Sequence, residues 1–266
     1  MEGVSSELAG EVRWIRFSRP AVLNALTLED LASIQRWVTD PGTGTRALVF
    51  TGTGDRAFSA GMHIDTFGAL DVARAREVIG AVRDALACVR TSPLPTAAMI
   101  NGYCLGAAFE LALTCDLRIC ADGAQFGLPE VKVGIPSVAD AALLQQHVGL
   151  ALAKELILTG DLYPAAALLQ RGLLNSMVPA GQLQAATETL ISRITRHTAA
   201  VIASQKRLFE IWQNTGLREG AEASVAEFAA MFAAPETSQQ IIAYRAALRR
   251  PAGPAGGRDP GKAPAD

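Results

Sequence analysis

Residues 96–116 place the strongest constraint on the fold, because they predict a buried strand that leads directly into a buried helix. Thr96–Ile100 is a short apolar run typical of a strand inside a sheet. Gly102 and Gly106 bracket a turn, and an apolar helix is expected over Ala107–Leu113. A strand, a turn and a helix in this order are typical of an α/β protein.

Glu110 is the unusual residue of this helix, because the side chains around it are otherwise apolar. A carboxylate is rarely buried without a partner or a function. The first N–H groups of a helix are also unpaired and aligned with its dipole, so they can hold an anion. The segment therefore predicts an acid/base group and an anion site within one helical turn.

Strands and helices alternate through the first half of the chain, which supports an α/β core. In order, we expect a strand at Glu11–Phe17, a helix capped by Thr27 and Asp30, a strand at Ala47–Phe50, a helix over Asp71–Arg90 and a strand at Asp116–Ala121. Helical segments dominate after Val138, which indicates a cap or an oligomer surface. Pro251–Asp266 is rich in proline, glycine and alanine, so a disordered tail is expected there.

Composition argues against several classes of protein. The 266 residues carry a formal net charge of −2, so no basic surface for nucleic acid is expected. The four cysteines lack metal-site spacing and indicate reduced thiols in a cytoplasmic protein, and His147 and His197 show no metal-ligand spacing either. No signal peptide and no apolar run of membrane-spanning length are visible. We therefore expect no metal, no membrane and no nucleic-acid partner.

A glycine-rich loop after the strand at Ala47–Phe50 offers one alternative function. Gly52, Gly54 and Ala57 loosely follow the dinucleotide-binding pattern G-x-G-x-x-A. No helix is expected to open after Gly54, and Asp71 begins a helix where the ribose-binding acid should end a strand. The pattern is therefore weak support for a nucleotide site.

His63 raises the possibility of a hydrolase. A Ser/His/Asp triad would need Ser59 or Ser137 beside His63 and Asp65, but the sequence has no nucleophile elbow at either serine. A single histidine in a loop is more often a surface or packing residue than a base.

Glu110 and Glu130 are the stronger candidates for acid/base chemistry. The expected strand Asp116–Ala121 lies between them and can bring Glu130 back toward Glu110. Two carboxyl groups in an apolar site have raised or separated pKa values and exchange protons near neutral pH. In the alternative interpretation, Glu110 pairs with an arginine such as Arg118, and Glu130 is solvated. Spacing alone leaves both open.

Four ordered motifs resemble the crotonase superfamily, the enoyl-CoA hydratase/isomerase family, over about Val12–Phe232. They are Ser18-Arg-Pro20 with Asn24-Ala-Leu26, Ala57-Phe-Ser-Ala-Gly61-Met62, the segment Asn101–Asp116, and Phe126-Gly-Leu-Pro129-Glu130-Val-Lys-Val-Gly134. The resemblance implies an α/β spiral of β-β-α units with a C-terminal helical trimerisation region. It divides the chain into a core over residues 1–198, a helical oligomerisation region over residues 199–250 and a disordered tail over residues 251–266.

The resemblance also implies an acyl-CoA substrate. The backbone N–H groups of Met62 and Ala107 would bind the thioester oxygen, where enolate charge develops. Glu110 and Glu130 would hold a water molecule and move protons between it and the α-carbon. The expected reaction is the reversible syn hydration of a 2-enoyl-CoA. No cofactor is expected, because coenzyme A is part of the substrate.

Further residues receive roles from the same resemblance. Ala60, His63 and Ile64 would bind coenzyme A, and Ser137 and Asp140 would lie in the substrate pocket. Lys206 and Arg207 are candidates for contacts to the coenzyme A phosphates, although basic residues on a helix are more often solvated. The assembly implied is a homotrimer or homohexamer.

Three differences from the family pattern keep other functions open. Ala107 and Ala108 replace glycines, His63 stands where an aspartate is usual, and Pro136–Asp140 replaces the common Pro-Gly-Ala-Gly-Gly. The same-fold alternatives are an isomerase, a racemase or an acyl-CoA hydrolase. The alternative of another class is a non-catalytic acyl-CoA-binding or scaffold protein, and the presence of both glutamates argues against it.

Overall fold

A computed structural model describes residues 3–248, and the predicted tail over residues 251–266 lies outside them. The chain divides into two compact units, with the boundary between Asn214 and Thr215. The strands are β1 Val4–Ala9, β2 Val12–Phe17, β3 Ala47–Gly52, β4 Ala57–Ser59, β5 Thr96–Ile100, β6 Tyr103–Leu105, β7 Leu117–Ala121, β8 Gln125–Gly127, β9 Tyr163–Pro164 and β10 Ser176–Val178. The helices are α1 Leu28–Thr39, α2 Val72–Arg90, α3 Ala107–Thr114, α4 Leu144–Val148, α5 Leu150–Thr159, α6 Ala165–Leu169, α7 Leu183–Thr195, α8 Ala199–Asn214, α9 Leu217–Ala230 and α10 Pro235–Leu248. Five short 3-10 helices are η1 Pro20–Val22, η2 Ile64–Phe67, η3 Pro129–Val133, η4 Ala139–Leu143 and η5 Ala180–Gln182.

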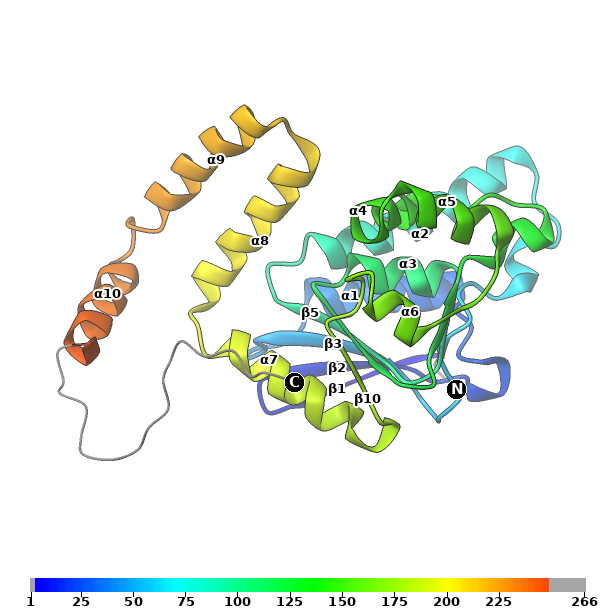
Figure 1. Ribbon diagram of the computed structural model, residues 1–266, viewed down its shortest axis with the longest axis horizontal. Helices are drawn as coiled ribbons and strands as arrows, with labels where there is room; N and C mark the ends of the chain where they lie inside the picture. The colour runs from blue at the N-terminus through cyan, green and yellow to red at the C-terminus, as the bar shows by residue number, and fades with distance from the viewer. Residues whose placement is uncertain (1–2, 249–266) are drawn as a thin grey trace. The chain divides into compact units, whose positions relative to one another are not determined.

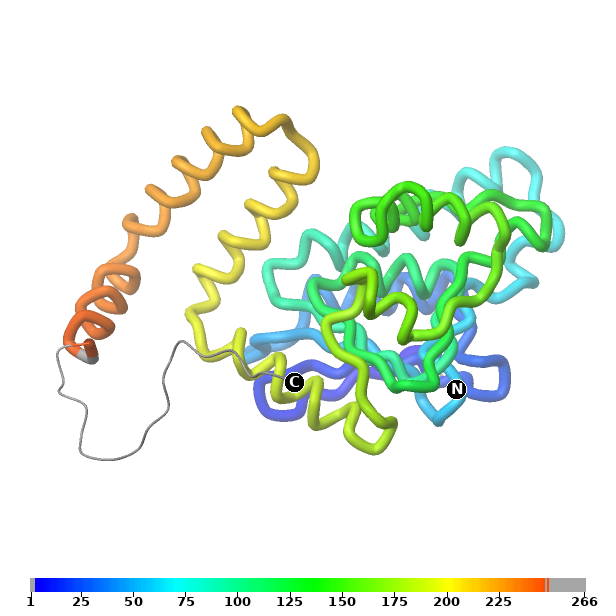
Figure 2. Tube along the Cα trace, in the orientation of Figure 1, coloured from blue at the N-terminus to red at the C-terminus, as the bar shows by residue number. Residues whose placement is uncertain are grey.

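Two sheets organise the first unit (Figure 1). The larger sheet has the order β1-β2-β3-β5-β7-β10, and the smaller has the order β4-β6-β8-β9. Each of β3, β5 and β7 is followed by a short strand of the smaller sheet and then by helical structure, so a strand–strand–helix unit recurs along the chain. Figure 2 traces the path of the chain through these units. This repetition is the α/β spiral that the resemblance implied.

The central strands of the larger sheet are buried on both faces. Successive side chains of a strand point to opposite sides, so each of these strands contributes to two cores. Ile15 and Phe17 pack in the core formed with α1, α2 and α3, whereas Trp14 packs on the other face. Leu183 and Ile191 of α7 cover that second face. This double cover explains why β3 and β5 are buried along their whole length and carry mostly apolar residues instead of an alternating pattern.

Local signals predicted several boundaries correctly. Thr27 and Asp30 form a reciprocal capping box at the start of α1, and the Asp71 side chain caps α2. Since Asp71 caps a helix and the loop after Gly54 leads into β4, the dinucleotide-binding interpretation is wrong. Strand β1 was not predicted because it pairs only with β2 and is mostly exposed, so it carries no apolar pattern.

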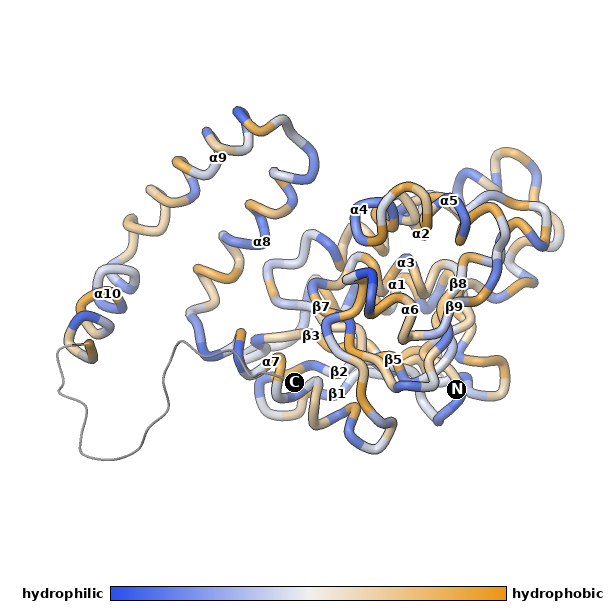
Figure 3. The backbone as a smooth tube through the Cα atoms, in the orientation of Figure 1, coloured by the Kyte–Doolittle hydropathy of each residue, from blue (hydrophilic) through white to orange (hydrophobic). Residues whose placement is uncertain are grey.

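The second unit contains the helices α9 and α10. Apolar and polar stretches alternate along both helices in Figure 3. Large apolar side chains are exposed on them, among them Leu217, Val225, Phe228 and Ile242. Helix α8, which the sequence grouped with this region, belongs to the first unit instead. Within residues 3–248, no helix is long and apolar enough to cross a membrane.

Candidate active site

A cavity of about 480 Å³ lies among the loop after β4, α2, the start of α3 and η3. Most of its wall is apolar, with Ile79 and Val82 contributed by α2. The residues assigned to the site from sequence that line it are Ala60, Met62, His63, Ile64, Ala107, Glu110 and Glu130. Segments distant in the chain therefore meet around one apolar space that holds two carboxyl groups.

Two backbone N–H groups at this cavity are unpaired within the described residues. The N–H of Leu26 donates to Gly61, and the N–H of His63 donates to Leu26, so Met62 between them points its own N–H away from Leu26. Ala107 is the first residue of α3, so its N–H has no partner in the helix. Both residues line the cavity.

Gly61 allows the two loops that carry these N–H groups to touch. It has a φ of +87°, and a Cβ added to it would lie 2.7 Å from the carbonyl oxygen of Leu105 and 3.1 Å from the nitrogen of Ala107. Any side chain would therefore push the Met62 loop away from the start of α3. The glycine keeps both donors at one place.

Glu110 is 3% exposed, and its Oε2 atom has no hydrogen-bond partner among residues 3–248. The pKa of Glu110 is raised to about 8, chiefly by burial and also by the negative charges of Glu130 and Asp140. Hydrogen bonds from the backbone N–H groups of Ala141 and Asp140 lower this pKa in part. The carboxyl group therefore holds a proton at neutral pH.

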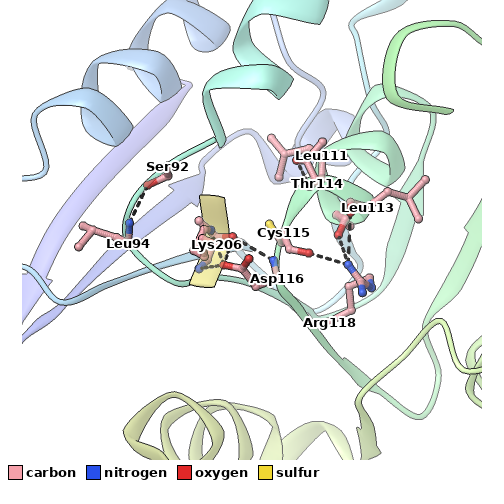
Figure 4. A network of polar contacts seen from close by, with 11 residues as sticks. Ser92, Leu94, Leu111, Leu113, Thr114, Cys115, Asp116, Arg118 and Lys206 are labelled. Carbon is pink, nitrogen blue, oxygen red and sulfur yellow. Dashed lines mark hydrogen bonds and ion pairs between the residues drawn. The ribbon is translucent and has the colours of Figure 1, made fainter. Parts of the chain in front are cut away.

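Arg118 does not pair with Glu110, which removes the alternative left open by spacing. Its guanidinium donates to the carbonyl oxygens of Ala112 at 3.1 Å, Cys115 at 2.6 Å and Leu173 at 2.7 Å. Figure 4 shows the contact with Cys115 at the end of α3. Arg118 thus satisfies the C-terminal carbonyls of the helix whose first turn carries Glu110.

Glu130 is half-buried and contacts the start of α3 and a nearby loop. Its Oε2 atom accepts a 2.8 Å hydrogen bond from the Ser137 hydroxyl. Its Oε1 atom lies against Gly106. The solvated-loop interpretation is therefore wrong.

Ser137 and Asp140 do not line this cavity, although both lie next to its acids. Ser137 reaches Glu130 as described, and Asp140 is buried with its Oδ1 atom 3.2 Å from Nε of Arg90. Arg90 also pairs with Glu210 of α8. The sequence analysis missed Arg90, because nothing in its local pattern distinguishes it from other arginines on α2.

His63 lines the cavity, and its Nδ1 atom is 3.5 Å from the Asp65 carboxylate. Ser59 is buried and accepts a hydrogen bond from the N–H of Gly61, so its hydroxyl oxygen serves the loop structure. Since Ser137 donates to Glu130, neither candidate serine contacts His63 in the described part of the chain. No group of three or more potential metal ligands occurs among the described residues.

Lys206 is buried, and its Nζ atom lies 2.5 Å from Oδ2 of Asp116 (Figure 4). The same oxygen accepts hydrogen bonds from the backbone and the hydroxyl of Thr96. The ammonium group is therefore buried and paired with a carboxylate, so the predicted contact between Lys206 and a coenzyme A phosphate is wrong.

The family model described as enoyl-CoA hydratase/isomerase matches residues 7–249. The chain belongs to this family. The "Probable enoyl-CoA hydratase echA8" of Mycobacterium bovis is 34% identical over 236 residues, which cover 86% of this chain and 90% of the relative. The fold class implied by the resemblance and the family assignment are both confirmed.

Solved structures of family members share the fold. The crystal structure of an enoyl-CoA hydratase from Bacillus anthracis has a TM-score of 0.87 at 26% identity, covering 92% of this chain and 97% of that chain. A "putative enoyl-CoA hydratase" from Thermobifida fusca in complex with acetoacetyl-CoA has a TM-score of 0.79 at 29% identity, covering 87% and 95%.

Proposed function

We propose that this chain is an enoyl-CoA hydratase that catalyses the reversible syn hydration of a 2-enoyl-CoA thioester. The observation that carries the proposal is the pair of glutamates in one apolar cavity, with Glu110 buried and its pKa near 8 beside the Glu130 carboxylate. Family membership and the relatives named as enoyl-CoA hydratases support the same reaction.

The two N–H groups form the oxyanion hole in this proposal. Addition of water across the α,β double bond passes through an enolate, so negative charge develops on the thioester oxygen. The N–H groups of Met62 and Ala107 donate to that oxygen, and the dipole of α3 adds to the stabilisation. Because both donors are backbone groups held by packed loops, they need little reorganisation during the reaction.

The two carboxyl groups divide the proton transfers. Glu130 and Glu110 hold the water molecule between them, above the double bond. One proton leaves the water as its oxygen bonds to the β-carbon, and one proton arrives at the α-carbon. Glu110, which holds a proton, can give one proton while Glu130 takes the other, so no external acid or base is needed.

Coenzyme A enters as part of the substrate, and we propose no separate cofactor. Ala60 and His63 lie on the loop that also carries Met62, and Ile64 begins η2 directly after it, so contacts there would place the thioester beside the oxyanion hole. The Thermobifida fusca relative with bound acetoacetyl-CoA supports an acyl-CoA as the ligand.

We further propose that the C-terminal helices form a trimer or a hexamer. Val225 and Phe228 on α9 expose 71% and 68% of their surfaces. Apolar side chains this exposed are typical of an interface with another chain.

Hydration of crotonyl-CoA, measured by loss of absorbance of the conjugated thioester, tests the reaction. We expect Glu110→Gln and Glu130→Gln each to lower kcat by about a hundredfold or more, because each removes one proton-transfer group. Arg83→Met, on an exposed residue of α2, is the control and should leave kcat unchanged. If both glutamine variants keep wild-type hydration, the mechanism is wrong.

A panel of short acyl-CoA substrates with product analysis separates the rivals on this fold. A hydrated product supports the hydratase, whereas a shifted double bond indicates an isomerase and free coenzyme A indicates a hydrolase. Absence of acyl-CoA binding in calorimetry would favour the scaffold alternative.

A further inference from the structure

The segment Ser137–Ala141 contacts both acids of the site. At one end, the Ser137 hydroxyl donates to Oε2 of Glu130 at 2.8 Å. At the other end, Asp140 and Ala141 belong to η4, which packs against α3, and their backbone N–H groups lower the pKa of the Glu110 carboxyl group. Five consecutive residues thus reach two glutamates that are twenty positions apart in the chain.

Arg90 anchors this segment from the end of α2. Its Nε atom lies 3.2 Å from Oδ1 of Asp140, and its terminal nitrogen pairs with Glu210 of α8. The Asp140 side chain is largely buried, so the pair is only weakly screened by solvent. Arg90, the last residue of α2, therefore links this helix to α8 and to the segment Ser137–Ala141.

The backbone of the segment is held in an uncommon conformation. Ala139 has a φ of +49°, which alanine rarely adopts outside sites where the surroundings impose it. Its neighbour Val138 lines the cavity, and Ala141 is buried in the core. Strain of this kind persists because contacts on both sides of Ala139 hold the chain.

We propose that Ser137–Ala141 is a positioning segment for both catalytic acids, and that Arg90 holds it in place through Asp140. Ser137 and Arg90 are positioning residues here, since neither lines the cavity. The inference rests on the proposed function, because it assigns the acids their roles in hydration. It explains why a serine and an aspartate occupy a loop in which the resembling family commonly has glycines.

The charges around Glu110 determine in which direction the loss of Arg90 would shift the pKa of Glu110. Glu130 faces it from η3 and Asp140 from η4, while Arg90 from α2 neutralises Asp140 and is itself balanced by Glu210 from α8. Loss of the Arg90 guanidinium would leave the Asp140 charge unopposed and would loosen the N–H groups that bond to Glu110. Both changes raise the pKa of Glu110.

Ser137→Ala tests the first contact. Loss of one hydrogen bond to a charged group corresponds to a fall of about tenfold in kcat, with KM for crotonyl-CoA nearly unchanged. Ser137→Thr keeps the hydroxyl and should recover most of the loss. An unchanged kcat in Ser137→Ala, or an equal loss in Ser137→Thr, would overturn this part of the proposal.

A double-mutant cycle tests whether Arg90 acts through Asp140. We expect Arg90→Met and Asp140→Asn each to lower kcat about tenfold, and the double variant to be no slower than either single variant. Arg90→Lys should restore part of the activity, and Arg83→Met on the same helix should have no effect. Independent losses that multiply in the double variant would contradict the inference.

A measurement without turnover separates this inference from the proposed function. Carboxyl carbon NMR of protein labelled at glutamate, assigned with Glu110→Gln, follows the titration of Glu110 directly. Arg90→Met should move it to higher pH, and Arg83→Met should not. If wild-type protein hydrates no acyl-CoA, the proposed function fails. If the titration of Glu110 in folded Arg90→Met is unmoved or moves to lower pH, the inference fails.

Discussion

The Oε1 atom of Glu130 lies so close to Gly106 that a Cβ on this glycine would be 2.8 Å from it. Gly106 also has a φ of +55° directly before the first helical residue, Ala107. One glycine thus sets the start of α3, the N–H of Ala107 and the approach of the second acid. The position of the Ala107 N–H and that of the Glu130 carboxyl group both depend on the absence of a side chain at Gly106.

Gly106→Ala is therefore expected to displace the Glu130 carboxylate and strain the helix start. We expect kcat for crotonyl-CoA to fall at least about tenfold and the free energy of unfolding to fall by about 1–2 kcal/mol. Gly80→Ala is the matched control, because its Cβ would meet open space in the interior of α2. That change should stabilise the protein by up to about 1 kcal/mol. Full activity in Gly106→Ala would contradict the close approach.

The raised pKa of Glu110 makes the stability of the protein depend on pH. Glu110 has a pKa of about 8 in the folded chain, against an ordinary value of 4.5. Between these values the unfolded chain loses the proton while the folded chain keeps it, so ionisation favours unfolding as pH rises. The resulting loss in the free energy of unfolding begins near pH 4.5 and levels off above about pH 8. It reaches several kcal/mol, because each unit of difference between the folded and unfolded pKa corresponds to about 1.4 kcal/mol.

Urea unfolding of wild-type protein and Glu110→Gln at pH 5, 6.5 and 8 measures this effect. The variant cannot ionise at this position. Its free energy of unfolding relative to that of the wild type should therefore increase steadily from pH 5 to pH 8. Other titrating groups cancel in the difference between the two proteins. A constant difference would mean that the pKa of Glu110 is not raised.

Arg118 is expected to stabilise α3 from its far end. Arg118→Met would leave buried carbonyl oxygens at the end of this helix without donors, including that of Cys115. We expect a loss of about 2–4 kcal/mol in the free energy of unfolding, measured in urea. Arg171→Met, at an exposed position, should change the stability by less than about 0.5 kcal/mol. Equal stabilities of the two variants would rule out a capping role for Arg118.

The proposed assembly depends on apolar contacts of α9. A charge at an interface that buries Phe228 is costly, so Phe228→Asp should shift the protein from a trimer or hexamer toward monomers. Sedimentation velocity over a range of concentrations measures the shift. Glu222→Asp, at an exposed residue of the same helix, is the control. If wild-type protein sediments as a monomer, the proposed assembly is wrong.

The sequence predicted elements whose signals are local. Thr27 and Asp30 marked the start of α1 because a capping box needs only residues three positions apart. The apolar run after Gly106 predicted α3 and placed Glu110 in its first turn for the same reason. Ordered motifs then identified the family, so most of the site was named before any contact was known.

Contacts between distant residues were decided only by the tertiary structure. Spacing left open whether Glu110 faces Glu130 or Arg118, because the path of the chain between them determines which side chain arrives. The sequence did not reveal that Lys206 is buried. Its partner Asp116 is ninety residues away in the chain, and the two meet only because α8 packs beside the end of α3. Local sequence patterns were enough to predict β2, β3, β5 and β7, the helices α1, α2 and α3, and the two candidate acids. Folding decided which charges meet and which are neutralised, because ion pairs and burial depend on distances in space.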